Sequence, residues 1–143
     1  MAYTYEYPRP AVTVDCVIFL REQQSTKLLL IRRGHDPFEG MWALPGGFVE
    51  MDETLEESAR RELQEETGLK NIVLKQLHTF GDPGRDPRGR TVAVVHYGFA
   101  SPQNSNVNGM DDASDARWFS IDDLPELAFD HNKIIHIALE KLN

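Results

Sequence analysis

The sequence predicts an α/β fold. Three observations support this prediction: β-branched apolar runs typical of strands, segments with helical amphipathic periodicity, and the alternation of the two kinds of element along the chain. In chain order we expect two strands, a helix, two strands and a helix, at Ala11–Leu20, Lys27–Arg32, Leu55–Thr67, Ile72–Phe80, Thr91–Ala100 and Asp130–Leu142. A chain of 143 residues with no internal repeat or linker is expected to form one domain, residues 1–143, with a real hydrophobic core.

Composition argues against several functional classes. The 41% hydrophobic and 27% charged content is ordinary for a soluble globular protein. No apolar run approaches the roughly 18 residues of a membrane span, and the N-terminus lacks a signal pattern, so we expect a cytoplasmic protein that does not engage a membrane. The net charge of −8 disfavours a nucleic-acid polymer as partner. The one cysteine, Cys16, and five scattered histidines do not support zinc or nucleophile chemistry.

The first ten residues are predicted to form an arm or an edge strand. Three tyrosines alternate there and two prolines follow, at Tyr3, Tyr5, Tyr7, Pro8 and Pro10. The prolines exclude a central strand because they cannot donate a ladder hydrogen bond. The arm covers the core, stacks on a base or crosses to a second subunit, and the last interpretation predicts a homodimer.

The central helix has clear start and stop signals. Thr54 is a good N-cap, and Glu57 three residues later completes a capping box. Gly68 occupies the place of a left-handed residue just after the helix. At about 100° per residue, one face must be buried, and it carries Leu55, Ala59 and Leu63.

Three carboxylates share the side of this helix next to its buried face. Glu62 and Glu66 flank the apolar stripe, and Glu65 lies one step further round. Like charges at this spacing repel one another, more strongly where water is scarce, and a bound cation would remove the penalty. Oxygen ligands alone indicate a hard cation, Mg²⁺ or Mn²⁺.

The spacing of these residues resembles a known motif. Gly47, five residues, Glu53, seven residues and then Arg61-Glu62-Leu63-x-Glu65-Glu66-x-Gly68-Leu69 match the Nudix box, G-x5-E-x7-R-E-U-x-E-E-x-G-U with U aliphatic, at every fixed position of residues 47–69. The resemblance implies an α/β/α sandwich with a mixed central β-sheet. It also implies hydrolysis of a nucleoside diphosphate linked to another group, with a divalent metal and an attacking water.

The resemblance assigns roles residue by residue. Glu62, Glu65 and Glu66 would bind the metal, with a backbone carbonyl of Gly46 or Gly47 as a further ligand. Arg61 and Glu53 would support the loop and helix by charge pairing. Arg32 and Arg33, at the end of the second strand, are either surface charges or, as in relatives, face the phosphates.

A second resemblance concerns the loop between the third and fourth expected strands. The segment Phe80-Gly81-x-Pro83-Gly84-Arg85-Asp86-Pro87-Arg88-Gly89 is similar to a loop of ADP-ribose pyrophosphatases, although Nudix-type sensor domains carry it too. Arg85, Arg88 and Arg90 make this loop locally basic. It is either a solvated loop or a binder of phosphate or ribose oxygens.

The segment 101–115 is polar and precedes a short expected strand, Ala116–Phe119. Nudix enzymes often take a further carboxylate from such a loop, for which the candidates are Asp111, Asp112 and Asp115. The same residues also suit turns and caps. Trp118 lies near the nucleoside site or in the core.

We therefore expect metal-dependent hydrolysis of ADP-ribose to AMP and ribose 5-phosphate, with Mg²⁺ or Mn²⁺ as cofactor. One alternative is a pyrophosphohydrolase that removes oxidised nucleoside triphosphates. An alternative of another class is a regulatory domain that binds ADP-ribose without cleaving it, which the complete set of box glutamates disfavours.

Overall fold

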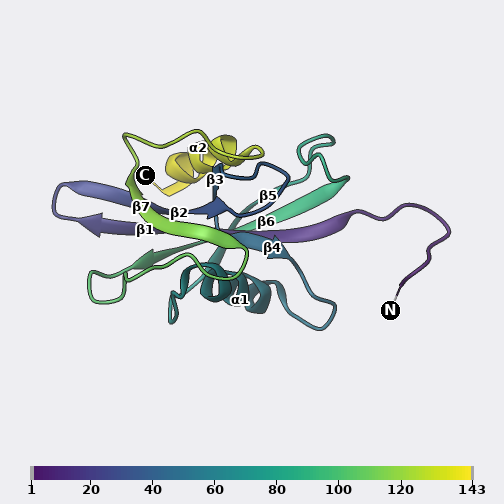
Figure 1. Cartoon of the computed structure of the whole chain (residues 1–143), viewed down its shortest axis with the longest axis horizontal. Coiled ribbons are helices and arrows are strands. Elements are labelled where there is room, and N and C mark those ends of the chain that lie inside the picture. The colour runs from purple at the N-terminus through teal and green to yellow at the C-terminus, as the bar shows by residue number, and fades with distance from the viewer. Residues whose placement is uncertain (1, 143) are drawn as a thin grey trace.

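The computed structural model describes residues 2–142, which form a mixed β-sheet with one helix on each face (Figure 1). The strands are β1 (Ala11–Glu22), β2 (Ser25–Arg33), β3 (Trp42–Ala43), β4 (Gly46–Phe48), β5 (Lys75–Phe80), β6 (Thr91–Ala100) and β7 (Ala113–Ser120). The helices are α1 (Leu55–Thr67) and α2 (His131–Leu142). This arrangement confirms the predicted α/β sandwich.

The central strand β1 explains the two-layer core. Its residues 13–20 are all buried, because a strand covered on both faces has no solvated side and therefore shows a continuous apolar run. Alternate side chains meet opposite helices: Cys16 packs with Ala59 and Leu63 of α1, whereas Val17 packs with Ile134 of α2. The expected burial of Cys16 is confirmed.

The sheet order is β3-β2-β1-β6-β5, with β1 and β6 parallel, β4 paired to β1 and β7 paired to β2. The antiparallel partner of β1 changes along its length. Thr13 to Asp15 pair with β4, and Phe19 to Glu22 pair with β2. β1 thus brings Asp15 next to Gly46 of β4, at the start of the glycine loop that leads into α1.

The predicted limits of α1 are confirmed. Both hydrogen bonds of the capping box are present, and Gly68 has φ +79° in the left-handed region.

The strand predicted at Ile72–Phe80 is shorter than expected, because β5 begins only at Lys75. Ile72 and Leu74 lie in the loop before β5, and their side chains are buried in the core beneath α1. Their apolar character had been interpreted as the start of the strand. The short strands β3 and β4 were not predicted, because segments of two and three residues are too short to show a strand pattern.

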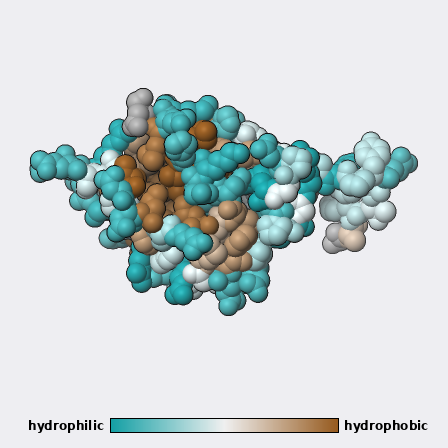
Figure 2. All heavy atoms as spheres, turned by 90° about the horizontal axis from the view of Figure 1, so that it is seen from above, coloured by the Kyte–Doolittle hydropathy of each residue, from teal (hydrophilic) through white to brown (hydrophobic). Residues whose placement is uncertain are grey.

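The N-terminal residues 2–10 form no strand and project from the body of the protein (Figure 1). Tyr3, Tyr5 and Tyr7 are all exposed, so the arm does not cover the core of its own chain. Viewed from the α2 side, apolar side chains gather on the body, whereas the arm stands apart from it (Figure 2). No helix within residues 2–142 is long and apolar enough to cross a membrane.

Candidate active site

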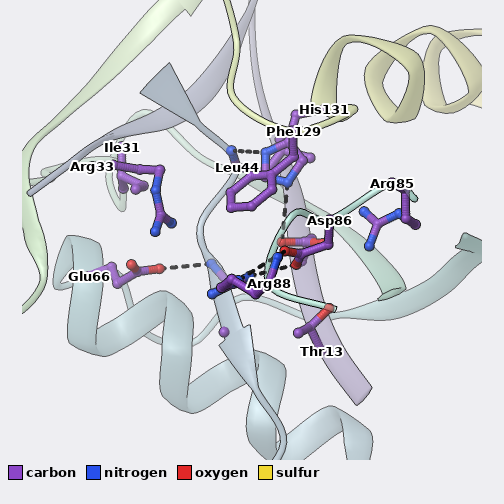
Figure 3. A pocket seen from close by; sticks show the side chains of 13 residues that line it. Thr13, Ile31, Arg33, Leu44, Glu66, Arg85, Asp86, Arg88, Phe129 and His131 are labelled. Carbon is purple, nitrogen blue, oxygen red and sulfur yellow. Dashed lines mark hydrogen bonds and ion pairs between the residues drawn. The ribbon is translucent and has the colours of Figure 1, made fainter. Parts of the chain in front are cut away.

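Two adjoining hollows lie between α1, the glycine loop and the loop 81–90. The outer hollow has a volume of about 330 Å³ and is bordered by Phe48, Glu62 and Asp112. The inner one is smaller, about 40 Å³, and reaches Asp15 and His131 (Figure 3). They share five lining residues, namely Arg33, Gly46, Gly47, Glu66 and Arg88. We treat them as one cleft.

The glycine loop lies directly against the carboxylates of α1. A Cβ on Gly47 would be 2.5 Å from Cδ of Glu62, so glycine is needed for this close approach. The backbone N–H of Gly46 donates a hydrogen bond to Oε1 of Glu66 at 2.8 Å. Loop and helix are therefore held together by Gly46 and by residues that the Nudix box specifies.

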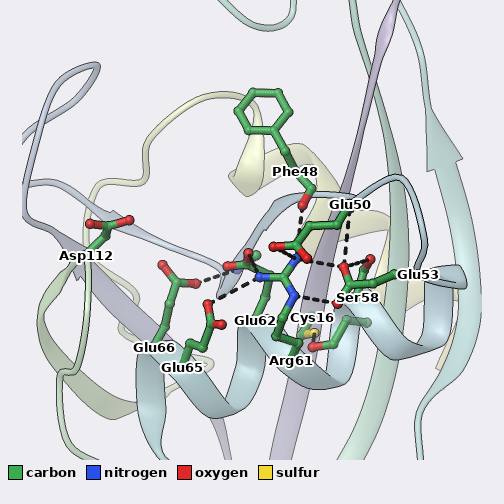
Figure 4. A network of polar contacts seen from close by, with 12 residues as sticks. Cys16, Phe48, Glu50, Glu53, Ser58, Arg61, Glu62, Glu65, Glu66 and Asp112 are labelled. Carbon is green, nitrogen blue, oxygen red and sulfur yellow. Dashed lines mark hydrogen bonds and ion pairs between the residues drawn. The ribbon is translucent and has the colours of Figure 1, made fainter. Parts of the chain in front are cut away.

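Arg61 holds several of these carboxylates by hydrogen bonds (Figure 4). Its Nε and Nη2 donate to both carboxylate oxygens of Glu53 at 2.6 and 2.9 Å, and Ser58 donates to the same carboxylate. These hydrogen bonds, those from Arg61 foremost, lower the pKa of Glu53 to about 2. Arg61 Nη1 donates to Glu62 at 2.7 Å and to Glu65 at 3.2 Å. The charge pairing expected of Arg61 and Glu53 is present.

Burial destabilises the charged forms of the two inner glutamates. Loss of hydration raises the pKa of Glu66 to about 8, despite the hydrogen bond from Gly46, and raises that of Glu62. The negative charge of Glu62 raises the pKa of Glu66 further. Two desolvated carboxylates four residues apart fit a divalent cation, which would stabilise both negative charges.

The third box glutamate does not converge with them. Within residues 2–142, no group of three or more His, Cys, Asp or Glu side chains has a geometry that could hold a metal. Glu65 points to Arg61 instead, because the guanidinium lies between Glu65 and Glu62. The donors that fit Mg²⁺ or Mn²⁺ are therefore Glu62 and Glu66, with Gly46 and Gly47 beside them. The metal role of Glu65 stays a prediction.

Of the five arginines predicted to bind substrate, Arg33 and Arg88 line both hollows. Arg32 is exposed and donates to the carbonyl of Gly40, and Arg90 donates to the carbonyl of Gly81. Arg85 borders the inner hollow, but its guanidinium is used elsewhere.

The guanidinium of Arg85 forms a bidentate ion pair with Asp130 at 2.7 and 2.9 Å, and its side chain is only 6% exposed. This pair joins the loop 81–90 to the start of α2. The structure thus gives Arg85 a structural contact, and its role in substrate binding stays a prediction.

The remaining candidates are dispersed. Asp112 lies at the rim of the outer hollow, 4.0 Å from His35. Asp111 has a left-handed backbone, with φ +54°, and Asp115 pairs with Arg117. Trp118 packs on the α1 core and donates to the carbonyl of Ser105, so it lines neither hollow.

Sequence reasoning missed the inner wall of the cleft. Burial raises the pKa of Asp15 to about 7. The Nε2 atom of His131 lies 3.8 Å from Oδ1 of Asp15, and its Nδ1 accepts a hydrogen bond from the backbone of Leu44 at 2.9 Å. Burial lowers the pKa of His131 to about 3, so this imidazole is neutral. One signal was available, since Asp15 is an acidic residue within an apolar strand.

Comparison with known proteins identifies relatives along almost the whole chain. The NUDIX domain family matches residues 9–137. The chain is 45% identical to an ADP-ribose pyrophosphatase of Methanocaldococcus jannaschii, over 90% of this chain and 73% of that protein. It is 35% identical to an ADPR responsive transcriptional repressor, NtrR, of Acinetobacter baylyi, over 96% of this chain but only 56% of the repressor.

Solved structures of Nudix-type proteins are similar to this chain in both fold and sequence. The NUDIX domain of Shewanella oneidensis NrtR in complex with ADP ribose has a TM-score of 0.87 and 36% identity, over 96% of this chain and 91% of that one. A bifunctional NMN adenylyltransferase/ADP ribose pyrophosphatase of Francisella tularensis, complexed with AMP and an Mn ion, has a TM-score of 0.82 and 30% identity, over 97% of this chain and 44% of that one.

Proposed function

Because the chain belongs to the Nudix domain family, we propose that it is a metal-dependent pyrophosphohydrolase that cleaves ADP-ribose to AMP and ribose 5-phosphate. The observation that carries the proposal is the placement of Glu62 and Glu66 against the Gly46–Gly47 loop, in a cleft that Arg33 and Arg88 also line. Acidic groups for a cation and basic groups for an anion thus share one cleft, as a pyrophosphate bound with a divalent metal requires.

Different residues of this cleft would bind the metal, bind the phosphates and accept a proton. Glu62 and Glu66 would hold Mg²⁺ or Mn²⁺, and Arg61 keeps Glu62 in place. When bound, the metal supplies charge neutralisation at the pyrophosphate oxygens and makes a water molecule more acidic. Arg33 and Arg88 would bind phosphate oxygens. Glu66, or Asp112 at the rim, would accept the proton of the attacking water.

ADP-ribose is favoured by two of the relatives. One at 45% identity is an ADP-ribose pyrophosphatase, and a structure at 36% identity holds ADP ribose. The same comparisons favour a second candidate, a domain that binds ADP-ribose as a signal, because the Acinetobacter relative is an ADPR responsive repressor. This chain matches 56% of that repressor, so the similarity does not by itself assign the repressor's role to this chain.

A substrate panel tests the proposal. Purified protein with Mg²⁺ or Mn²⁺ is given ADP-ribose, NADH, diadenosine polyphosphates, GTP and 8-oxo-dGTP, and product release is measured. We expect turnover to be highest on ADP-ribose. Glu66→Gln should lower kcat on the order of 1000-fold, since a catalytic metal supplies several kcal/mol. Glu56→Gln is the matched control, because Glu56 lies on the same helix, is exposed and, among residues 2–142, forms an ion pair with Arg60 alone.

Each result of the panel has a clear meaning. Turnover of oxidised dGTP in preference to ADP-ribose would identify an enzyme that removes oxidised nucleotides. Tight binding of ADP-ribose without turnover in either metal would identify a sensor and refute the hydrolase proposal.

We also propose that the chain acts as a single domain, in the cytoplasm, and that its N-terminal arm contributes to a homodimer. The support for the dimer is the arm itself, since Tyr3, Tyr5 and Tyr7 are exposed and belong to none of the core clusters formed by the described residues. Light scattering after size-exclusion chromatography, with and without residues 2–10, tests this. A monomer in both preparations would refute the dimer.

A further inference from the structure

Phe129 has an unusual backbone for its size. It lies just before α2 with φ +53°, in the left-handed region that bulky residues rarely adopt. A glycine or an asparagine would adopt this conformation at lower cost. Its ring is anchored against Phe38 at 4.7 Å between centroids and against His131 at 5.3 Å. A strained residue held by its neighbours in a cleft suggests that the position of the ring matters.

The ring of Phe129 lies next to both arginines of the cleft (Figure 3). Cζ of Arg33 is 5.0 Å from its centroid, and Cζ of Arg88 is 5.1 Å away. Arg88 is also 4.7 Å from the ring of Phe48. Phe48, Arg88, Phe129 and Arg33 therefore form an alternating row, which we call the aromatic–arginine row. Its members come from β4, the loop 81–90, the segment before α2, and β2.

The two guanidiniums need such a support. Arg88 lowers the pKa of Arg33 by repulsion, second to the effect of burial, so the two cations act on each other. Asp86 holds Arg88 by hydrogen bonds at 2.8 and 3.1 Å, and the carbonyl of Pro37 accepts from Nε of Arg33. The Nη2 atom of Arg33 is buried and has no hydrogen-bond partner among the described residues. A buried donor without a partner is costly unless an acceptor binds to it.

We propose that Phe129 is a positioning residue, which holds Arg33 and Arg88 as a fixed pair for the two phosphates of the substrate. The negative face of an aromatic ring attracts a guanidinium, so one ring can hold two mutually repelling cations at a set separation. This inference rests on the proposed function in one respect, namely that a pyrophosphate binds in this cleft.

Binding of ADP and AMP tests the proposal without turnover. Titration calorimetry is done in EDTA at low salt, so that no metal takes part. For Phe129→Leu, which keeps an apolar side chain but removes the ring, we expect ADP to bind about tenfold more weakly, from the loss of two cation–π contacts. AMP has one phosphate, so its binding should weaken less than that of ADP. The ratio of ADP affinity to AMP affinity should therefore fall in Phe129→Leu. Phe129→Tyr keeps the ring and should restore ADP binding.

Two controls separate positioning from folding. Phe99→Leu removes a ring that contacts Arg21 at 4.6 Å and lines neither hollow, and it should bind ADP like the wild type. Phe129→Gly suits the left-handed backbone and also lacks the ring, so it should fold and still bind ADP weakly. It serves in place of Phe129→Leu if that variant unfolds.

A double-mutant cycle gives the sharpest result. In a chain with Arg33→Gln and Arg88→Gln, Phe129→Leu should cause no further loss of ADP affinity, because Phe129 acts through the arginines. The proposal is overturned if Phe129→Leu weakens ADP less than twofold, or if its effect is the same with and without the arginines.

The inference and the proposed function can fail separately. If the wild type does not cleave ADP-ribose but Phe129→Leu loses ADP affinity as expected, the positioning role stands and the substrate assignment fails. If the wild type cleaves ADP-ribose and Phe129→Leu binds ADP normally, the positioning role fails and the substrate assignment stands.

Discussion

Replacing Gly47 with alanine would place a methyl group against the carboxylate of Glu62. The new Cβ would lie 2.5 Å from Cδ and 2.6 Å from both oxygens, closer than real Cβ atoms come to other atoms. The carboxylate is the far end of a flexible side chain, so it can retreat. The cost in folding stability should therefore be near the low end for overpacking, about 1 kcal/mol.

The effect on activity should be much larger. To reach an ordinary contact, the carboxylate of Glu62 must move by roughly 1 Å, and a displacement of this size at a catalytic group costs about 100-fold in rate. Gly47→Ala should thus lower kcat for ADP-ribose about 100-fold while the protein remains folded. The hydrogen bond from Arg61 to Glu62 would be strained by the same movement.

Two measurements together test this reasoning. Urea denaturation gives the loss of stability, and initial rates with Mg²⁺ give kcat. Gly81→Ala is the control, because a Cβ there meets only ordinary contacts with Val92, at 3.6 Å or more. A Gly47→Ala enzyme with the kcat of the wild type would refute the idea that this glycine is needed to place Glu62.

Three further predictions concern stability. First, burial raises the pKa of Asp15 from 3.8 to about 7, so folding favours the protonated acid. The stability that the protonated acid contributes is complete below about pH 4 and is lost as the pH rises to about 7. Over this window the wild type should lose stability relative to Asp15→Asn in urea titrations with EDTA. Second, Arg85→Ala should destabilise the fold by about 3 kcal/mol, as expected for a broken buried ion pair, and adding Asp130→Ala should cost less than the sum of the single changes; additive losses would contradict the pairing. Third, Thr54→Ala should cost about 1 kcal/mol by removing the capping box, and an unchanged denaturation midpoint would show that the cap is not needed.

Local chemistry explains what could be predicted from the sequence. The limits of α1 follow from Thr54 and Gly68, which act on the backbone within a few residues of themselves. The strands β1 and β6 follow from apolar runs long enough to outweigh other signals. The box glutamates share one helix, so their spacing alone places them on one side.

The inner wall of the cleft depends on contacts that no local pattern encodes. His131 meets Leu44 across 87 residues of chain, and Arg85 meets Asp130 across 45. Such pairs decide how each arginine of the loop 81–90 is held. Arg85 lines the inner hollow but its guanidinium is bound by Asp130, whereas Arg88 is paired within its own loop by Asp86 and lines both hollows.

The same argument explains why Glu65 differs from its neighbours. On a helical wheel it is close to Glu62 and Glu66, and the family motif groups all three. In the folded protein its oxygen lies 3.2 Å from Nη1 of Arg61, four residues earlier on α1. Nη1 of Arg61 also binds Glu62, so a metal that recruits Glu65 must compete with that guanidinium. Metal affinity should therefore report on Arg61 as well as on the carboxylates, since loosening Arg61 frees Glu65 but also frees Glu62 from its support.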